Sequence, residues 1–282
     1  MKEIAVISGK GGTGKTTITA AFAGLCDAVL ADCDVDASNL PLILTPEIKR
    51  EEEFSGSVKA VKNELCTLCG ECRRVCRFGA VTSDFDIISV KCEGCGTCTL
   101  VCPSKAVSLT ETPTGKIFVS DTRYGPMVHA QLNIGEEASG KLVTRVRDMA
   151  EEIAETKNKG IILIDGSPGI GCPVIASIVG CSSVIMVTEP TLSGIYDLER
   201  IHDVVSHFHI PYCVLINKYD INIKNVKRIE SWCTQKGIPL GGKIPYDIRV
   251  VEALVSGKTV LEYEGNATTK IREIWRTIQN TL

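Results

Sequence analysis

The sequence predicts an α/β protein with a doubly wound, mostly parallel sheet, interrupted once by a small cysteine-rich insert. Strand-length apolar runs alternate with stretches of helical periodicity over most of the chain, as in a parallel sheet covered by helices. The strands are continuous Val, Ile and Leu runs such as Ile161–Ile164, which is typical of strands buried on both faces. The alternation stops between about residues 54 and 115, where eight of the chain's 14 cysteines lie.

Each expected element follows from its local pattern: short β-branched runs predict strands, and apolar residues three or four apart predict helices. The expected strands are Glu3–Ser8, Ala28–Asp32, Ile117–Ser120, Gly160–Asp165, Ser183–Thr188, Tyr212–Asn217 and Leu240–Ile244. The expected helices are Lys15–Cys26, Ser139–Lys157, Pro173–Gly180, Gly194–His209, Lys224–Lys236 and Arg249–Ser256. A last helical pattern, Thr268–Gln279, has one apolar face, which predicts either a helix docked on the sheet or a membrane-binding tail; we expect docking.

Composition narrows the function classes. The 282-residue chain has a net charge of −3, from 31 Lys and Arg against 34 Asp and Glu, which excludes a general nucleic-acid coat. Its apolar runs fall far short of the ~20 residues of a membrane span, and Met1 leads into a strand without a signal-peptide core. We therefore expect a cytoplasmic protein, in which clustered cysteines indicate metal rather than disulfides.

The cysteine-rich segment contains an internal repeat. Residues Cys66–Val81 recur as Cys92–Val107, an offset of 26 residues (92 − 66), and each copy carries the run C-x₂-C-x₂-C-x₃-C. Two short repeats cannot bury a large core, so cofactors must supply much of their stability. We expect residues 54–115 to form a small, separately folded insert in a larger domain made of residues 1–53 and 116–282.

A phosphate-binding loop is predicted near the amino terminus. Gly9–Thr16 fits the pattern G-x-x-x-x-G-K-[ST] between an expected strand and an expected helix. Glycines let the backbone curl around phosphates, and the helix amino terminus adds partial positive charge. In this arrangement Lys15 reaches the β- and γ-phosphates and the Thr16 hydroxyl binds Mg²⁺. The simpler alternative is an ordinary glycine-rich turn.

The run from Lys10 to Thr17, Lys-Gly-Gly-Thr-Gly-Lys-Thr-Thr, resembles the deviant Walker A motif of the MinD/ParA/Mrp and nitrogenase-iron-protein superfamily of P-loop ATPases. The resemblance implies a P-loop NTPase fold, Mg-ATP as ligand, and a nucleotide-dependent homodimer in which Lys10 reaches a phosphate across the interface. Lys10 as an ordinary exposed loop lysine is the alternative.

Further segments resemble the same superfamily. Asp32-Cys-Asp34-Val-Asp36 matches its first switch, which implies that Asp34 orients the attacking water and that Asp36 or Asp32 lies nearer the metal; three acids at a strand end also cap helices. The stretch from Ile161 through Asp165 to Gly169 resembles Walker B and the second switch. The resemblance implies that Asp165 holds Mg²⁺ and that the Gly169 N–H senses the γ-phosphate.

Two segments bear on the base. Asn217-Lys218-Tyr219-Asp220 matches the N-K-x-D motif of GTPases, which alone predicts GTP. The resembled superfamily also has Asn-Lys here and uses ATP, with Asn217 reading the adenine amino group and a later loop, here Pro245-Tyr246, contacting the base. We therefore favour ATP. The residues expected at the nucleotide are Gly9, Lys10, Gly11, Gly12, Thr13, Gly14, Lys15, Thr16, Thr17, Gly169, Asn217, Lys218, Pro245 and Tyr246, with Lys10, Lys15, Asp34 and Asp165 as catalytic residues and Thr16, Asp34 and Asp165 at Mg²⁺.

The cysteine runs resemble the bacterial two-cluster ferredoxin, in which the fourth cysteine of each run binds the other cluster. The resemblance implies an inserted α+β ferredoxin-like domain with two [4Fe–4S] clusters. One would be held by Cys66, Cys69, Cys72 and Cys102, and the other by Cys76, Cys92, Cys95 and Cys98. Zinc is the alternative, but it needs only four ligands, usually as two C-x₂-C pairs. The first run departs from the pattern, because Arg77 stands where the second run has Pro103.

The combined motifs predict a dimeric Mg-ATPase whose nucleotide state is coupled to electron transfer through the two clusters, with an unidentified redox or metallocofactor partner protein. One alternative is an ATP-dependent carrier or assembly factor for Fe–S clusters or metallocofactors, although no C-x-x-C occurs outside residues 66–102. The other is a MinD/ParA-like positioning or scaffold ATPase with structural or redox-sensing clusters. Cys172, in the second switch, raises the further hypothesis of an extra metal or cluster.

Overall fold

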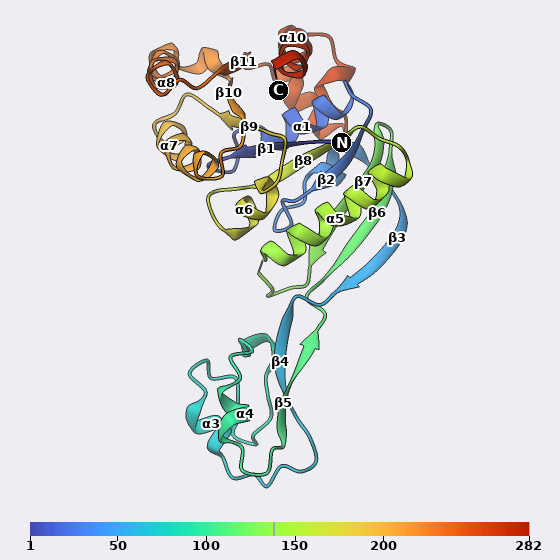
Figure 1. Ribbon diagram of the computed structural model, residues 1–282, viewed down its shortest axis with the longest axis vertical. Helices are drawn as coiled ribbons and strands as arrows, with labels where there is room; N and C mark the ends of the chain where they lie inside the picture. Colours follow the sequence, from blue (N-terminus) through green and yellow to red (C-terminus); the bar gives the residue numbers. More distant parts are fainter. Residues whose placement is uncertain (138, 282) are drawn as a thin grey trace. The chain divides into compact units, whose positions relative to one another are not determined.

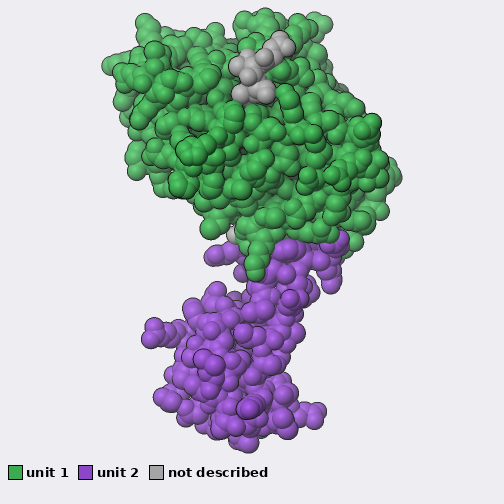
Figure 2. Space-filling view, viewed as in Figure 1, with its two compact units in different colours: residues 1–51, 117–131, 138–282 green, residues 52–116, 132–137 purple. Residues whose placement is uncertain are grey.

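The computed structural model describes residues 1–137 and 139–281, which form two compact units (Figure 2). Unit 1 consists of Met1–Glu51, Ile117–Gln131 and the described residues after position 138, and unit 2 of Glu52–Lys116 and Leu132–Glu137. Residues 132–137, which the sequence-based boundaries assign to the larger domain, belong to unit 2. The Asn133 N–H donates to the Thr114 carbonyl at 2.9 Å, and Lys59 pairs with Glu136 at 3.0 Å.

The main sheet has nine strands in the order β11-β10-β9-β1-β8-β2-β7-β6-β3 (Figure 1). Their bounds are β1 Lys2–Ser8, β2 Ala28–Asp32, β3 Glu47–Phe54, β6 Gly115–Thr122, β7 Gly125–Leu132, β8 Ile161–Pro168, β9 Ser183–Thr188, β10 Tyr212–Asn217 and β11 Leu240–Ile244. Strand β1 pairs in parallel with β8 and β9, β2 with β7 and β8, and β10 with β9 and β11. The expected mostly parallel sheet is confirmed.

Helices cover both faces of this sheet, so the doubly wound arrangement is also confirmed. Helices α1 and α10 pack on one face, and α5 and α6 on the other (Figure 1). The helices of unit 1 are α1 Lys15–Ala23, α2 Leu40–Leu44, α5 Gly140–Thr156, α6 Cys172–Ile178, α7 Leu192–His207, α8 Ile223–Lys236, α9 Ile248–Val255 and α10 Asn266–Thr281. Short 3₁₀ turns lie at Tyr219–Ile221 and Val260–Glu262.

Every strand and helix expected from the sequence is present, and the elements that were missed have weak patterns. Strand β3 is rich in charged residues and mostly exposed, as is common at a sheet edge. Strand β7 begins Gly125-Pro126, two residues that usually interrupt strands, and only two residues separate it from β6, which is the connection of an antiparallel pair.

The carboxyl-terminal pattern forms α10, whose apolar face is docked as expected. The buried Trp275 ring lies 4.7 Å from the Phe22 ring of α1, and Ile271, Ile274 and Ile278 join the same core cluster. Along the described chain, no helix is both long enough and apolar enough to cross a membrane.

Unit 2 is built from the cysteine repeat and a pair of strands. Strands β4 Ser57–Lys62 and β5 Val107–Thr112 are antiparallel, with Lys62 opposite Val107. One-turn helices α3 Glu71–Val75 and α4 Thr97–Val101 begin at the same place in the two repeats, each after a glycine with positive φ, and a 3₁₀ turn lies at Ser89–Lys91.

Candidate functional site

The loop between β1 and α1 depends on close backbone approach. Gly12 and Gly14 have φ values of 81° and 92°, a region that favours glycine. A Cβ at Gly14 would lie 2.2 Å from Asn217 Nδ2, which itself donates to the Thr13 carbonyl at 2.7 Å. The loop is therefore hydrogen-bonded to the end of β10, and it approaches Asn217 so closely that only glycine fits at position 14.

Lys15, the first residue of α1, lies under this loop between two carboxylates. Its Nζ is 2.9 Å from Asp165 Oδ1 and 3.5 Å from Asp34 Oδ2, and only 6% of its side chain is exposed. Burial lowers the pKa of Lys15, but the neighbouring Asp165 and Asp34 outweigh burial and raise it above its ordinary value. The ammonium therefore stays charged at a place where few water molecules compensate it.

Asp165 is fully buried at the carboxyl end of β8 and fixes two hydroxyls of α1. Its Oδ2 accepts from Thr16 Oγ1 at 2.7 Å and its Oδ1 from Thr19 Oγ1 at 2.9 Å. A hydroxyl and a carboxylate so placed are the hard oxygen donors that Mg²⁺ prefers. Thr19 was not expected at the site; its signal is its position four residues after Lys15, on the same helix face.

The three acids after β2 take different positions. Asp32 accepts from Ser38 Oγ at 2.7 Å and from the Asp34 N–H at 3.1 Å, and burial, with Asp165 adding to it, raises its pKa to about 7. Burial also raises the pKa of Asp34, although Lys15 opposes the shift. Asp36 is exposed. Asp34 is thus the acid that faces Lys15, while Asp32 fastens the loop that follows it.

A cavity of about 630 Å³ opens beside the loop. Of the residues expected at the nucleotide and at Mg²⁺, it is lined by Gly11, Gly12, Thr13, Gly14, Lys15, Thr16, Thr17, Asp34, Asn217, Lys218, Pro245 and Tyr246. Its apolar wall, not foreseen from the sequence, includes Leu42, Ile43, Val250, Val251 and Leu254. The cavity therefore has a charged end and an apolar end.

Four expected residues lie outside this lining: Gly9, Lys10, Asp165 and Gly169. Gly9 packs so closely on α7 that a Cβ there would lie 2.3 Å from the Asp197 carbonyl oxygen. The Gly169 N–H donates to the Ser8 carbonyl at 2.9 Å. Asp165 lies buried behind Thr16.

Lys10 is held away from the cavity by a residue that the sequence did not single out. Its Nζ donates to Glu189 Oε1 at 2.7 Å, Ser193 Oγ at 2.9 Å and Thr191 Oγ1 at 3.2 Å. The other oxygen of Glu189 pairs with Lys218 Nζ at 3.2 Å. Glu189 follows β9 directly, so its place at the carboxyl end of a parallel strand is the signal that predicts it.

The side chains of the N-K-x-D segment make different hydrogen bonds from those of a guanine-binding site. Asp220 Oδ1 accepts from the Tyr246 N–H at 2.7 Å, which fastens the Pro245-Tyr246 loop, and Asp220 does not line the cavity. The Oδ1 atom of Asn217 accepts from the Lys218 N–H at 3.0 Å.

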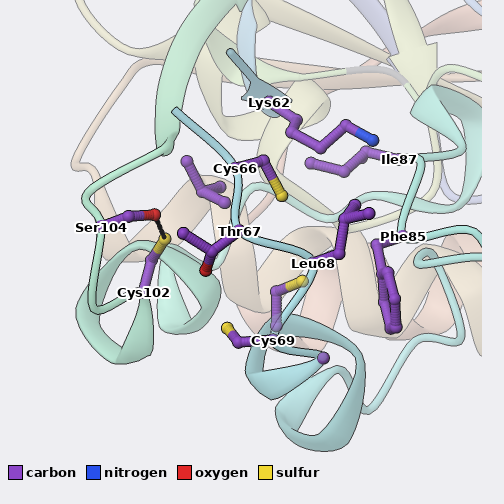
Figure 3. Close-up of a pocket in the computed structure, with 12 residues that line it drawn as sticks. Lys62, Cys66, Thr67, Leu68, Cys69, Phe85, Ile87, Cys102 and Ser104 are labelled. Atoms are coloured by element: carbon purple, nitrogen blue, oxygen red, sulfur yellow. Dashed lines mark hydrogen bonds between the residues drawn. The ribbon is translucent and has the colours of Figure 1, made fainter. Parts of the chain in front are cut away.

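In unit 2 the eight clustered cysteines surround two small hollows of about 10 and 20 Å³, on the measure that gives the cavity in unit 1 its 630 Å³. We name them the first cysteine pocket, lined by Cys66, Cys69, Cys72 and Cys102, and the second cysteine pocket, lined by Cys76, Cys92, Cys95 and Cys98. Figure 3 shows Cys66, Cys69 and Cys102 around the first of them. Among the described residues, no three His, Cys, Asp or Glu side chains lie close enough together to hold a single metal ion.

The two repeats share one backbone conformation. Positive φ recurs at the same offset of 26 residues in the pairs Leu68 and Gly94, Gly70 and Gly96, and Gly79 and Lys105. The fourth cysteine of each run accepts an N–H bond from the residue four positions on: Ala80 to Cys76 at 3.4 Å and Ala106 to Cys102 at 3.2 Å. The sequence repeat is therefore also a structural repeat.

The remaining cysteines divide by burial. Cys33, Cys181, Cys213 and Cys233 are buried, and Cys26 is half-buried. Cys172 is exposed at the start of α6. An extra metal or cluster at Cys172 stays a prediction.

The comparison with protein families agrees with the geometry of unit 1. A family model described as the CobQ/CobB/MinD/ParA nucleotide binding domain matches residues 4–260. The chain belongs to this family. Two uncharacterized proteins of Methanocaldococcus jannaschii are similar along nearly the whole chain: one is 29% identical over 281 residues, covering 98% of this chain and 96% of its own, and the other is 30% identical over 272 residues, covering 93% of each.

Solved structures show the same MinD/ParA fold. The cell division ATPase MinD of Pyrococcus furiosus has a TM-score of 0.59 at 19% identity, covering 100% of this chain and 99% of its own. The septum site-determining protein MinD of Pyrococcus horikoshii, in complex with Mg-ADP, has a TM-score of 0.60 at 18% identity, covering 99% and 96%. The P-loop NTPase fold expected for the larger domain is thereby confirmed.

The loop geometry predicts opposite outcomes for two glycine substitutions. Gly14→Ala places a methyl group against Asn217 at positive φ, so the free energy of unfolding should fall by about 1–3 kcal/mol and nucleotide affinity by more than tenfold. Gly160→Ala is the matched control, because a Cβ there meets no atom within 4 Å, its φ is not positive, and it does not line the cavity. Urea unfolding and nucleotide titration calorimetry measure both; equal losses in the two variants would contradict the close approach at Gly14.

Proposed function

We propose that this chain is a MinD/ParA-like Mg-ATPase that works as a nucleotide-dependent homodimer. One observation carries the proposal: Lys15, Thr16, Asp34 and Asp165 converge at the carboxyl ends of β2 and β8, beside the 630 Å³ cavity. Open α/β sheets bind ligands at this edge. The membership of the chain in a nucleotide-binding family supports the same conclusion.

The chain's residues have separate roles in this proposal. The positive-φ glycines and the amino terminus of α1 hold the phosphates through backbone N–H groups. Lys15 balances the charge that develops on the transferred phosphoryl group. Thr16 and Asp165 hold Mg²⁺, which when bound neutralises phosphate oxygens. Asp34, next to Lys15 and at the cavity wall, orients the attacking water.

The base end of the cavity supports ATP rather than GTP. In GTPases the Asp of N-K-x-D accepts hydrogen bonds from guanine, whereas Asp220 is committed to the Tyr246 N–H and lies outside the cavity. Asn217 and Tyr246 line the cavity instead, next to the apolar wall. An amide, an aromatic ring and aliphatic side chains suit the flat, weakly polar adenine ring.

Dimerisation requires Lys10 to leave Glu189. The lysine is part-exposed and already on the phosphate side of the sheet, with its ammonium held by three oxygen atoms. A partner's triphosphate offers more negative charge than one carboxylate, so an approaching copy shifts Lys10 from Glu189 to phosphate. This exchange makes the dimer depend on ATP.

The ATPase proposal predicts a trapped dimer. Asp34→Asn should slow ATP hydrolysis by about a hundredfold or more, because the water loses its carboxylate acceptor. Mg-ATP should still bind, because Asp165 remains paired with Lys15. Sedimentation should then find dimers with Mg-ATP and monomers with Mg-ADP. Adding Lys10→Ala to this variant should abolish the dimer, and adding Lys227→Ala, an exposed lysine of α8, should not. Monomers under every nucleotide condition would refute the nucleotide-dependent dimer.

We propose further that unit 2 binds two [4Fe–4S] clusters. The donor sets fit: each pocket gathers four thiols drawn from both repeats, and backbone N–H groups already point at the sulfurs of Cys76, Cys92 and Cys102. Thiolates that bind different irons of one cluster stand further apart than ligands of one ion, which agrees with the finding of no single-ion site among the described residues. Bound clusters of this kind supply one-electron transfer.

Coupling between ATP and the clusters is a second candidate function, favoured by one connection. The segment after Asp34 runs into α2, which lines the nucleotide cavity with Leu42 and Ile43, and then directly into β3, where unit 2 begins at Glu52. The family comparisons fit a MinD/ParA-like ATPase better than redox coupling. In that alternative, a positioning or scaffold ATPase, the proposed clusters would be structural or redox-sensing. A carrier role finds less support, because no C-x-x-C occurs outside the array.

The cluster proposal predicts about eight irons and eight sulfides per chain in anaerobically purified protein. Cys69→Ser should lower both contents by about half, because Cys69 lines the first cysteine pocket and not the second. Cys172→Ser, which changes another exposed thiol outside both pockets, should leave them unchanged; a loss of iron there would instead establish a further site. Wild-type protein without sulfide would end the cluster proposal.

Measuring ATP hydrolysis with oxidised and with reduced clusters separates the two candidate functions. Redox coupling predicts different rates in the two states of the wild-type protein. Equal rates, together with unchanged cluster potentials when Mg-ATP is added, would leave the positioning or scaffold ATPase. Cys69→Ser is the control, since any effect that depends on the first cluster should be lost in it.

A further inference from the structure

The two cysteine pockets carry opposite charges at their walls. Lys62 lines the first pocket and Glu93 lines the second. The repeat offset of 26 residues pairs Lys62 with Ile88 and Glu93 with Thr67, so neither charge has a counterpart in the other repeat. The two repeats therefore form similar pockets, which differ in the charges that Lys62 and Glu93 place at their walls.

The structure holds the Lys62 ammonium at the first pocket. Lys62 ends β4 opposite Val107, which lines the same pocket, and its side chain extends along the pocket wall beside Ile87 (Figure 3). Its Nζ lies 2.6 Å from Asp86 Oδ1. Asp86 itself is not part of the pocket lining, whereas Lys62 lines the pocket and its ammonium lies within electrostatic range of Cys66 and Cys72.

Glu93 stands between two ligand cysteines of the second pocket, Cys92 and Cys95. The second pocket has one more amide-to-sulfur hydrogen bond than the first, and such a bond raises the potential of a cluster. The Ala60 N–H donates to Cys92 at 3.3 Å, in addition to the amide bond to the fourth cysteine that both repeats have. A formal charge acts over a longer range than one amide dipole, so the Lys62 and Glu93 charges decide the difference.

We propose that Lys62 and Glu93 set unequal reduction potentials for the two clusters, with the higher potential in the first cysteine pocket. Reduction adds negative charge to a cluster, which a nearby ammonium stabilises and a nearby carboxylate destabilises. An electron on unit 2 then rests in the first pocket. The inference depends on the proposed clusters. It assigns to Lys62 and Glu93 the role of tuning the cluster potentials electrostatically, without binding iron.

Anaerobic redox titration followed by electron paramagnetic resonance tests this, with iron and sulfide counted in every protein. Lys62→Met should lower the higher midpoint potential and leave the lower one unchanged. Glu93→Gln should raise the lower potential and leave the higher one unchanged, and Asp86→Asn should raise the higher one, because the ammonium loses its counter-charge. Lys62→Arg keeps the charge and should keep both potentials.

Lys59→Met is the matched control: Lys59 lies on the same strand, pairs with Glu136, and lines neither pocket, so both potentials should stay at their wild-type values. Lys62→Met protein with full iron and sulfide but unchanged potentials, or with a shift in the lower potential, overturns the inference while the clusters stand. Wild-type protein without iron and sulfide overturns the clusters and this inference together.

Discussion

The buried ammonium of Lys15 is the interaction on which the nucleotide site depends. It faces the carboxylates of Asp34 and Asp165, and Asp32 adds a third acid within electrostatic range. Removing one partner of such a group leaves an uncompensated buried charge, which costs about 3–5 kcal/mol. The same cluster fixes the start of α1, through Thr16 and Thr19, and the ends of β2 and β8. Stability and chemistry therefore reside in the same few atoms.

This cluster is rich in acid, and that imbalance explains its ligand. One ammonium faces three carboxyl groups, of which Asp32 has its pKa raised to about 7 by burial and by Asp165. A divalent cation supplies the missing positive charge, and a triphosphate next to it brings oxygens to complete its shell. In the proposed function, bound Mg²⁺ would add positive charge where the folded chain has an excess of carboxyl groups.

Unit 2, in contrast, has little hydrophobic core of its own. The buried apolar side chains that the structure describes in it are Ala60, Ala80, Val81, Ala106 and Val107, all small. Larger apolar side chains such as Leu65, Phe78 and Leu100 are exposed. A unit of this size that buries so little apolar surface is marginally stable by itself, and metal binding would add to its folding free energy. The proposed clusters would fill the two hollows that the side chains do not, and so serve the fold as well as any redox role.

Sequence patterns predicted the fold of unit 1 well because its central strands are buried on both faces and its helices are amphipathic. They failed at β3, whose charged residues suit an exposed edge, and at β7, which starts with Gly125-Pro126. At the site, residues fixed by local chemistry, such as Gly14 and Lys15, were predictable from spacing alone. Glu189 and the apolar wall were missed, because strands and helices from distant segments bring Glu189 beside Lys10 and the wall residues to the cavity.

Helix α2, which connects the Asp34 segment to β3 and unit 2, is another example of site residues that the sequence does not reveal. Leu42 and Ile43 of α2 line the nucleotide cavity, yet no motif marks them. The carbonyls of Ile43 and Leu44 accept from Arg123 at 2.9 and 3.2 Å, so α2 is fastened at its end while its start follows the Asp34 loop. Strand β3 follows α2 and leads along the chain into unit 2, and this covalent connection is the path that the coupling hypothesis requires.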